Sequence, residues 1–368
     1  MISCEKIHKV FEKNNIGYFT GVPDSILKEW ISYIVDNEDK LVHRIAANEG
    51  AAIGHAAGYY LSTGKIGVVY MQNAGLGNAV NPLTSLTDND VFGIPMLLII
   101  GWRGEPGKKD APQHAKMGKV MLPLLDTLGI SYEILNAKNI NDQIKSAKEK
   151  AERENIPVAL IVKRDFFSEY IEKKNRQKTL ELSREEAIYT IVDTFNGDEI
   201  VVATTGKISR ELFECRQARG QKHNGDFYVV GSMGHASAIA MEIACQRPEK
   251  KVYLFDGDGA LIMHAGTMAT IGYYAPENLF HIVFDNCCHE STGGQPTVSD
   301  KIDIATIARG CNYKNANICF RKEDIIRKVR GFKKGPVALI IKVKKGSRVD
   351  LGRPKISPRD NKKEFMNP

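Results

Sequence analysis

The chain has 368 residues and a mass of 40.9 kDa, which is more than one ordinary domain holds and enough for two. With 43% hydrophobic and 26% charged residues, the composition is typical of a soluble globular protein and excludes a disordered or fibrous chain. No apolar run approaches the roughly 20 residues that a membrane span needs, and the first residues lack a secretory pattern. We therefore expect a cytoplasmic protein with no membrane contact.

The net charge of +7 is unevenly distributed. Residues 321–368 hold 16 basic and 5 acidic residues, so the rest of the chain is slightly acidic. The basic segment lacks the interleaved aromatic residues and the helix-turn-helix pattern of nucleic-acid binders, so we expect no nucleic-acid partner. We expect residues 347–368 to be a basic tail that folds over its own protein or serves an anionic substrate. The seven cysteines include no C-x-x-C pair, which favours reduced thiols.

An internal repeat organises the chain. The heptad PVALIVK at 157–163 recurs as PVALIIK at 336–342, with an offset of 179 residues. Apolar runs typical of buried strands occur in chain order at 42–46, 66–71, 96–101, 158–162, 200–203, 227–230, 252–255, 279–284 and 337–343. Helical patterns between them include 51–61, 141–154, 184–196 and 236–245. The alternation predicts an α/β fold with two similar, doubly wound parallel-sheet domains.

The predicted domains span 1–170 and 183–346, with a polar linker at 171–182 between them. Doubly wound sheets bind ligands at the carboxyl ends of their strands. Candidate chemistry is therefore sought directly after the predicted strands.

The sharpest candidate site follows the predicted strand at 252–255. Asp258 stands between Gly257 and Gly259, which let a ligand approach the backbone, and the next strand is followed by Asn286. A carboxylate and an amide oxygen on neighbouring strand ends, with a backbone carbonyl beyond, suit a Mg²⁺ ion that takes its other ligands from phosphate. A simple turn fits the same residues, so this spacing alone leaves both interpretations open.

The spacing resembles the signature of the thiamine diphosphate-dependent decarboxylase family, in which Gly-Asp-Gly and a later Asn are separated by 26 residues, as here. The resemblance implies that Asp258, Asn286 and the carbonyl of Cys288 hold Mg²⁺. It also implies that the diphosphate lies against Gly257, Gly259 and Ala260. Asp285 replaces the Asn that many members carry at this point, but that position is not a metal ligand.

A second spacing agrees with this resemblance. Met233 lies 25 positions before Asp258, where the family has the large apolar residue that bends the cofactor. The same mapping implies that the carbonyl of Gly231 and the N–H of Met233 contact the aminopyrimidine. It assigns the diphosphate further donors after a strand end, at Thr204, Thr205 and Gly206. Taken alone, the glycines at 231 and 234 are also an ordinary entry to the helix predicted at 236–245.

The first domain is expected to supply the acid that activates the cofactor. The resemblance implies that Glu49 hydrogen-bonds the pyrimidine nitrogen and promotes the tautomer that forms the thiazolium ylide. A local alternative is that Asn48 caps a helix and Glu49 complements its dipole. The motifs of the second domain favour the catalytic role.

Further motifs resemble the phosphonopyruvate decarboxylases of this family over nearly the whole chain. They lie at 21–25, 72–78, 101–107, 112–114, 291–297 and 350–354. The resemblance implies non-oxidative decarboxylation of 3-phosphonopyruvate to phosphonoacetaldehyde in phosphonate biosynthesis. It also implies that the middle domain of larger relatives is missing, and that a homodimer or larger assembly builds its active sites between subunits.

The same resemblance supplies candidates for substrate chemistry. Asp24 and His114 are expected to transfer protons from loops over the cofactor. Arg103 and Gln113 are candidates for binding the phosphonate, on a loop with Lys108 and Lys109 whose amines equally fit solvated surface. The alternatives are a sulfopyruvate decarboxylase, an acetolactate-type carboligase, and a non-catalytic module that binds a cofactor or an anion.

Overall fold

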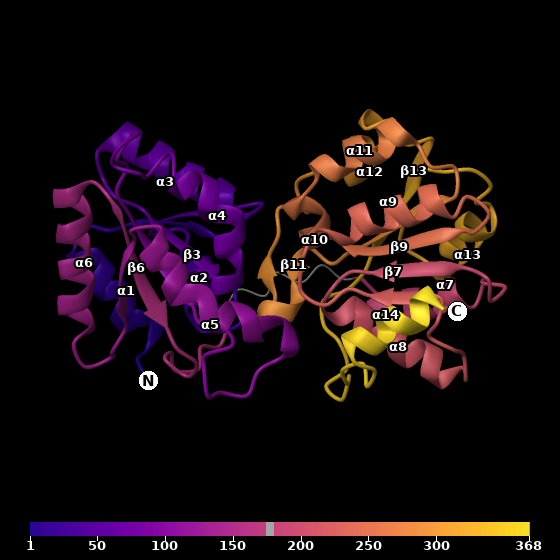
Figure 1. The fold of residues 1–368 in the computed structure, drawn as a ribbon, viewed down its shortest axis with the longest axis horizontal. Coiled ribbons are helices and arrows are strands. Elements are labelled where there is room, and N and C mark those ends of the chain that lie inside the picture. The colour runs from indigo at the N-terminus through magenta and orange to yellow at the C-terminus, as the bar shows by residue number, and fades with distance from the viewer. Residues whose placement is uncertain (174–179, 368) are drawn as a thin grey trace. The chain divides into compact units, whose positions relative to one another are not determined.

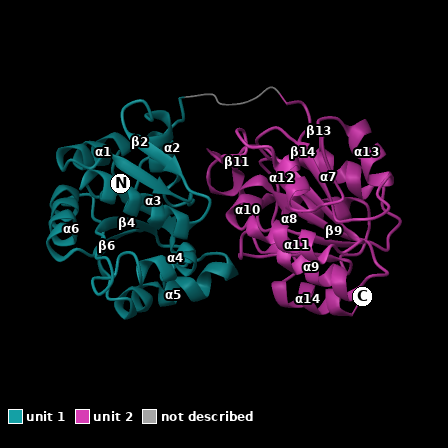
Figure 2. Cartoon of the chain, turned by 90° about the horizontal axis from the view of Figure 1, so that it is seen from above, with its two compact units in different colours: residues 1–175 teal, residues 176–368 magenta. Residues whose placement is uncertain are grey.

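A computed structural model describes residues 1–173 and 180–367 of the chain. The chain divides into two compact units, Met1–Asn175 and Arg176–Pro368, which Figure 2 colours separately. Each unit is built on a six-stranded parallel sheet with helices on both faces (Figure 1). The described residues contain no helix that is long and apolar enough to cross a bilayer.

The sheet of unit 1 has the strand order β2-β1-β3-β4-β6-β5. Its strands are β1 (Tyr18–Gly21), β2 (Val42–Ile45), β3 (Val68–Gln72), β4 (Met96–Gly101), β5 (Ser131–Ile134) and β6 (Pro157–Val162). The helices that cover it are α1 (Cys4–Lys13), α2 (Lys28–Asp36), α3 (Glu49–Thr63), α4 (Leu76–Leu83), α5 (Pro112–Thr127) and α6 (Ile140–Glu154), with a short 3-10 turn η1 (Asn73–Gly75) before α4.

The sheet of unit 2 has the order β13-β14-β10-β9-β7-β8. Its strands are β7 (Ile200–Ala203), β8 (Asp226–Tyr228), β9 (Val252–Gly257), β10 (Leu279–Asp285), β13 (Asn315–Cys319) and β14 (Val337–Lys342). The helices are α7 (Arg184–Val192), α8 (Lys207–Ala218), α9 (Ala236–Gln246), α10 (Asp258–Met263), α11 (Gly266–Tyr274), α12 (Ile304–Gly310), α13 (Lys322–Arg330) and α14 (Pro358–Met366). A small antiparallel pair, β11 (Cys288–His289) and β12 (Gln295–Pro296), flanks the turn η2 (Glu290–Thr292).

The two sheets share one topology. When the six parallel strands of each unit are counted in chain order, both sheets read 2-1-3-4-6-5. The repeated heptad forms the sixth strand of each, β6 and β14, and both strands are buried. Apolar side chains pack on both faces of each sheet, which explains why most strands read as continuous apolar runs. The prediction of two similar doubly wound domains is confirmed.

Three strands escaped the sequence prediction. The strands β5 and β13 lie at sheet edges and are only partly buried, so they carry polar residues instead of an apolar run. The strand β1 is buried but has only four residues, one of them Thr20. The helix predicted at 184–196 ends at Val192.

Local signals account for several helix starts. Ser183 and Glu186 form a reciprocal capping box at the start of α7. Ser357 caps α14 and is followed by a proline at the first helical position, where the missing N–H costs no hydrogen bond.

The predicted linker at 171–182 crosses the division between the units, and its residues 174–179 lie outside the described part of the chain. Unit 1 continues past residue 170, because Tyr170 and the backbone N–H of Lys173 both donate to Asp36. Leu182 already belongs to the core of unit 2.

The basic tail folds onto unit 2, one of the two roles considered for it. Helix α14, yellow in Figure 1, packs against the edge strand β8. The side chain of Asn361 accepts from Tyr228 N at 3.1 Å and donates to Asp226 O at 2.9 Å. The ring of Phe365 lies 5.5 Å from that of Phe227. Asn361 therefore supplies the hydrogen bonds that a neighbouring strand would otherwise make.

We expect Asn361→Ala to lower the free energy of unfolding by about 2 kcal/mol, because it leaves two buried backbone groups without partners. Urea unfolding followed by circular dichroism measures this loss. Asn367→Ala is the matched control, since that exposed amide bonds only within α14. Equal stability of the two variants would contradict the docking of the tail through Asn361.

Candidate active site

Both sheets have a crevice between their first and third strands, where the direction of strand addition reverses. In unit 2 these strands are β7 and β9, so the crevice lies beside residues 204–206 and 258–260. In unit 1 they are β1 and β3. There the Asp24 carboxylate accepts a hydrogen bond of 2.7 Å from the Gln72 amide. The topology thus brings the predicted polar residues to the carboxyl edge of each sheet.

Asp258 and Asn286 lie at adjacent strand ends in unit 2. Gly257 of β9 is in register with Phe284 of β10. Asp258 and Asn286 follow just beyond this pair, and the side chains of both are buried. One oxygen of Asp258 accepts hydrogen bonds from Thr297 at 2.5 Å and Ser299 at 3.0 Å. Burial, followed by repulsion from Asp285, raises the pKa of Asp258 to about 7.

The amide of Asn286 is oriented by its neighbours. Its nitrogen donates to Glu290 at 3.0 Å, and its oxygen accepts from Cys288 N at 3.1 Å. Glu290 also accepts from Gly346 N at 2.8 Å. The residue directly before the tail therefore helps to hold the loop that carries Asn286. Cys288 itself pairs with Pro296 in the small β11–β12 ladder.

A second carboxylate lies beside the first. Asp285 is fully buried and forms an ion pair with Lys342, the last residue of the repeated heptad. Ser299 lies between the two carboxylates, 2.8 Å from Asp285 and 3.0 Å from Asp258. The Lys342 ammonium balances the charge that Asp285 brings to this edge.

The loop after β7 has the features of an anion site. The Thr204 hydroxyl is buried and finds no hydrogen-bond partner among the described residues. Thr205 accepts from Gly231 N at 3.1 Å, which ties this loop to the next one. Gly206 has φ +107°, and a Cβ there would lie 2.6 Å from the Ser291 hydroxyl. Helix α8 begins directly afterwards with no side-chain cap, so its first N–H groups stay available.

The remaining predicted cofactor contacts surround the same edge. Met233 is half-buried in the loop between β8 and α9. Gly257 ends β9, and α10 carries Gly259 and Ala260 in its first turn. The local alternative for the glycines at 231 and 234 holds, because their loop leads into α9. The simple turn considered for Asp258 is not found, because this residue begins the helix α10.

Glu49 begins α3 in unit 1 and is buried. Asn78 donates to its Oε2 at 2.7 Å, and burial raises the pKa of the carboxyl above its ordinary value. A Cβ at Gly75 would lie 2.5 Å from Oε1, so only a glycine leaves room for this side chain. Asn48 caps the helix by accepting from Ala51 N at 2.9 Å. Asn48 therefore caps the helix, as the local alternative predicts. The side chain of Glu49 is buried in unit 1.

Asp24 and His114 take different positions. Asp24 lies fully buried in the loop between β1 and α2, and its pKa is raised, chiefly by burial. The expectation of a loop position for His114 was wrong: His114 is buried in the first turn of α5, because Pro112 starts the helix two residues earlier.

Arg103 is engaged within its own unit. Its guanidinium forms a bidentate pair with Asp110, with Nε donating at 2.8 Å and Nη2 at 2.5 Å. Nη1 donates to Ser25 at 2.6 Å. Gln113, Lys108 and Lys109 are exposed. A cavity of about 330 Å³ lies beside Arg103 and is lined also by Ser25, Ile26, Lys28, Glu29, Arg164, Asp165 and Phe167.

Comparison with known proteins agrees with this geometry. Residues 4–122 match the N-terminal TPP binding domain of thiamine pyrophosphate enzymes, and residues 204–343 match the C-terminal TPP binding domain. The chain is 31% identical to phosphonopyruvate decarboxylase of Streptomyces viridochromogenes, over 94% of this chain and 89% of the relative. The chain belongs to the thiamine pyrophosphate-dependent decarboxylases.

Other members of this decarboxylase family are also similar. Sulfopyruvate decarboxylase of Methanosarcina acetivorans is 29% identical over 89% of this chain and 87% of that protein. The sulfopyruvate decarboxylase subunit beta of Methanothermobacter thermautotrophicus is 34% identical, but it matches only 45% of this chain and 84% of its own length. The two matched family regions correspond to the two sheets, and the described residues between them form no middle domain.

The residues of unit 2 fit the cofactor of this decarboxylase family. The unpartnered Thr204 hydroxyl and the uncapped start of α8 suit diphosphate oxygens. Among the described residues, no group of three or more His, Cys, Asp or Glu side chains is placed to hold a metal. Asp258 and Asn286 offer one carboxylate and one amide, which suit a hard cation that takes further oxygen ligands from phosphate.

Sequence reasoning missed the residues that support this edge. Three of these residues contact the candidate ligands Asp258 and Asn286, namely Thr297, Ser299 and Glu290. A fourth, Lys342, pairs with the neighbouring Asp285. None of the four stands at a diagnostic spacing from the candidate ligands. Two signals were available. Thr297 ends the motif at 291–297, and Lys342 ends the second copy of the repeated heptad.

We expect Lys342→Met to lower the free energy of unfolding by about 3 kcal/mol, because Asp285 would stay buried without its cation. The double variant Asp285→Asn/Lys342→Met should recover most of this loss, since it removes both charges. Urea unfolding measures both effects. Lys344→Met, at an exposed site two residues away, is the control. A double variant as unstable as Lys342→Met would contradict the pairing.

Proposed function

We propose that this protein decarboxylates 3-phosphonopyruvate to phosphonoacetaldehyde and CO₂, in the cytoplasm, as a step of phosphonate biosynthesis. The observation that carries the proposal is the similarity to phosphonopyruvate decarboxylase over 94% of the chain. Two features of the structure support it: the buried acid Glu49 in unit 1, and the oxygen ligands Asp258 and Asn286 in unit 2. Thiamine diphosphate and Mg²⁺ are the proposed cofactors.

Each unit contributes a defined set of residues to the cofactor site. When bound, thiamine diphosphate supplies the nucleophilic carbon and then accepts the electron pair released as CO₂ leaves. Asp258, Asn286 and the Cys288 carbonyl hold Mg²⁺. The diphosphate is bound by Thr204, Thr205, Gly206, Gly257, Gly259 and Ala260, and the pyrimidine by Gly231 and Met233. Residues 183–346 thus form the diphosphate-side domain, and residues 1–170 the pyrimidine-side domain.

Glu49 holds the proton that activates the cofactor. Asn78 bonds Oε2, and we assign the proton to Oε1, which faces Gly75. Because burial raises the pKa of Glu49, this carboxyl keeps its proton closer to neutral pH than an exposed glutamate does. It therefore serves as the acid toward the pyrimidine ring nitrogen.

Asp24 and His114 transfer protons at the substrate. The raised pKa of buried Asp24 suits a group that carries a proton at working pH and delivers it to carbon after CO₂ leaves. Arg103 and Gln113 are proposed contacts of the substrate anion. Arg103 lines the cavity in unit 1, although any contact must compete with Asp110 and Ser25.

We propose that the active enzyme is a homodimer or a larger assembly. Glu49 belongs to unit 1, and the metal ligands belong to unit 2. In the proposed assembly, unit 1 of one subunit and unit 2 of another together complete each active site.

A sulfopyruvate decarboxylase is the second candidate, favoured by the similarity to the Methanosarcina acetivorans enzyme over 89% of this chain. The two substrates differ in charge, because a phosphonate is a dianion near neutral pH and a sulfonate is a monoanion.

We expect the purified protein to release CO₂ from 3-phosphonopyruvate only when thiamine diphosphate and Mg²⁺ are both present. A coupled assay for CO₂ on phosphonopyruvate, sulfopyruvate and pyruvate tests this, and kcat/KM should be highest for phosphonopyruvate. A preference for sulfopyruvate would establish the second candidate. No CO₂ from any of the three would overturn the decarboxylase proposal.

We expect Glu49→Gln to keep thiamine diphosphate binding within about threefold and to slow decarboxylation at least about a hundredfold, because an amide cannot give a proton to the ring nitrogen. Deuterium exchange at the thiazolium C2, followed by NMR, should slow in parallel. The matched control is Glu38→Gln, on a partly exposed carboxylate of the same unit. Unchanged exchange in Glu49→Gln would limit Glu49 to a structural role.

A further inference from the structure

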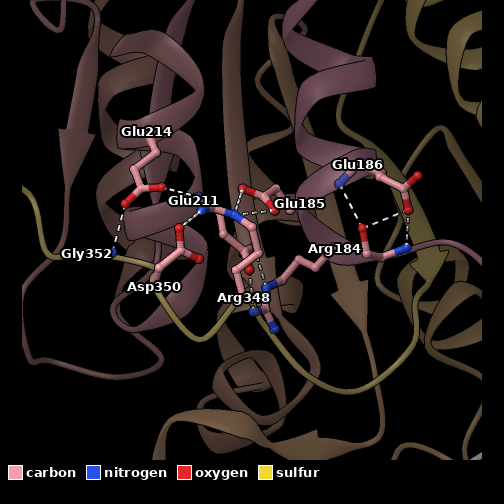
Figure 3. Close-up of polar contacts among 9 residues, drawn as sticks. Arg184, Glu185, Glu186, Glu211, Glu214, Arg348, Asp350 and Gly352 are labelled. Atoms are coloured by element: carbon pink, nitrogen blue, oxygen red, sulfur yellow. Dashed lines mark hydrogen bonds and ion pairs between the residues drawn. The ribbon is translucent and has the colours of Figure 1, made fainter. Parts of the chain in front are cut away.

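The acidic side chains of helix α8 are already paired. Glu211 forms a buried bidentate pair with Arg184, with both hydrogen bonds at 2.7 Å. Glu214 pairs with Arg348, a residue of the tail (Figure 3). Arg348 also donates to Glu185 and, at 2.8 Å, to Asp350. These contacts fasten the start of the tail to α7 and α8.

Three basic side chains of the same region have no such partner. Lys207, Arg210 and Arg353 make no hydrogen bond or ion pair within the described ranges 1–173 and 180–367. Lys207 and Arg210 are three residues apart on α8 and therefore share a face of the helix. Arg210 would find Glu214 one turn further on, but the tail has taken that carboxylate.

The tail brings the third cation to this face. The backbone N–H of Gly352 donates to Glu214 at 2.7 Å (Figure 3), so Arg353 directly follows a residue that is bound one helical turn from Arg210. Burial lowers the pKa of Arg210, and the charge of Arg353 lowers it further. Burial, followed by the charge of Arg210, also lowers the pKa of Lys207. Arg210 is therefore repelled by Lys207 and by Arg353, although Glu290 offsets part of this effect on Lys207. An anion bound next to Arg210 would relieve this repulsion.

This cationic group adjoins the candidate cofactor edge. Lys207 directly follows Gly206, whose backbone approaches Ser291 on the loop that carries Asn286. Arg353 belongs to the tail motif at 350–354, which the proposed function leaves without a role. In contrast to Arg103, none of the three cations must give up a carboxylate to bind a ligand.

We propose that Lys207, Arg210 and Arg353 form a binding site for a tetrahedral phosphorus oxyanion, supplied by the phosphonate of the substrate or by the terminal phosphate of the cofactor. The identity of both sources rests on the proposed function. The tail thus completes the site by pairing with Glu214 and delivering Arg353. A dianion gains more from three cations than a sulfonate does, so the site favours phosphonate over sulfonate.

The test compares Arg353→Gln and Arg210→Gln with Arg359→Gln, a control that removes the same charge from an exposed position on α14. On the holoenzyme, calorimetry measures the Kd of methylphosphonate and of methanesulfonate, and assays measure KM and kcat for phosphonopyruvate and pyruvate. A separate titration gives the Kd of thiamine diphosphate with Mg²⁺. Thermal melting of each variant checks that it is folded.

If the substrate is the source, Arg353→Gln and Arg210→Gln should each raise the Kd of methylphosphonate and the KM for phosphonopyruvate about ten- to a hundredfold. The KM for pyruvate and the Kd of the cofactor should stay unchanged. If the cofactor is the source, its Kd should rise by this factor, and both substrates should lose activity equally. The proposal is overturned if both variants match Arg359→Gln in every measurement. Methylphosphonate binding tests the site even if phosphonopyruvate is not decarboxylated, which separates this proposal from the proposed function.

Discussion

A parallel sheet points the carboxyl ends of all its strands to one edge, and the rest of this structure depends on that constraint. Because both units share the order 2-1-3-4-6-5, each has its crevice between the first and third strands. Asp24 and Gln72 meet at this edge in unit 1, and Thr204 and Asp258 follow the corresponding strands in unit 2. The loops differ, but the duplicated scaffold positions them in the same way. This permits one unit to specialise in an acid and the other in oxygen ligands.

Several buried or partly buried carboxylates of this chain have an ion-pair partner. Asp285 is balanced by Lys342, Asp110 by Arg103, and Glu211 by Arg184. Removing a single member of such a pair leaves an uncompensated buried charge, which costs more than the pair itself contributes. Glu49 differs, since its buried carboxyl has a neutral amide beside it. Burial raises the pKa of Glu49, and this is the direction that the proposed acid needs.

The tail connects stability with recognition. Asn361 completes the edge of the sheet at β8, and Arg348 gathers carboxylates from α7 and α8. Both contacts hold a basic segment against its own unit, where net positive charge would otherwise favour release. The same pairing occupies Glu214, and Arg210 forms no ion pair within the part of the chain that the structure describes. The contacts of the tail with unit 2 therefore place its positive charges at defined positions.

The sequence is enough to predict the repeated α/β architecture, the strand ends that carry polar residues, and the family. These follow from local patterns: the recurring heptad, apolar runs of strand length, and the spacing from Asp258 to Asn286. Which charged side chains meet depends on the fold. Lys342 lies 57 residues from Asp285, and Arg348 lies 163 residues from Glu185. The fold also places His114 in a helix and pairs Arg103, whereas Arg353 makes no hydrogen bond or ion pair among the described residues. Ion pairing depends on distances between side chains of separate segments, and no spacing along the chain records those distances.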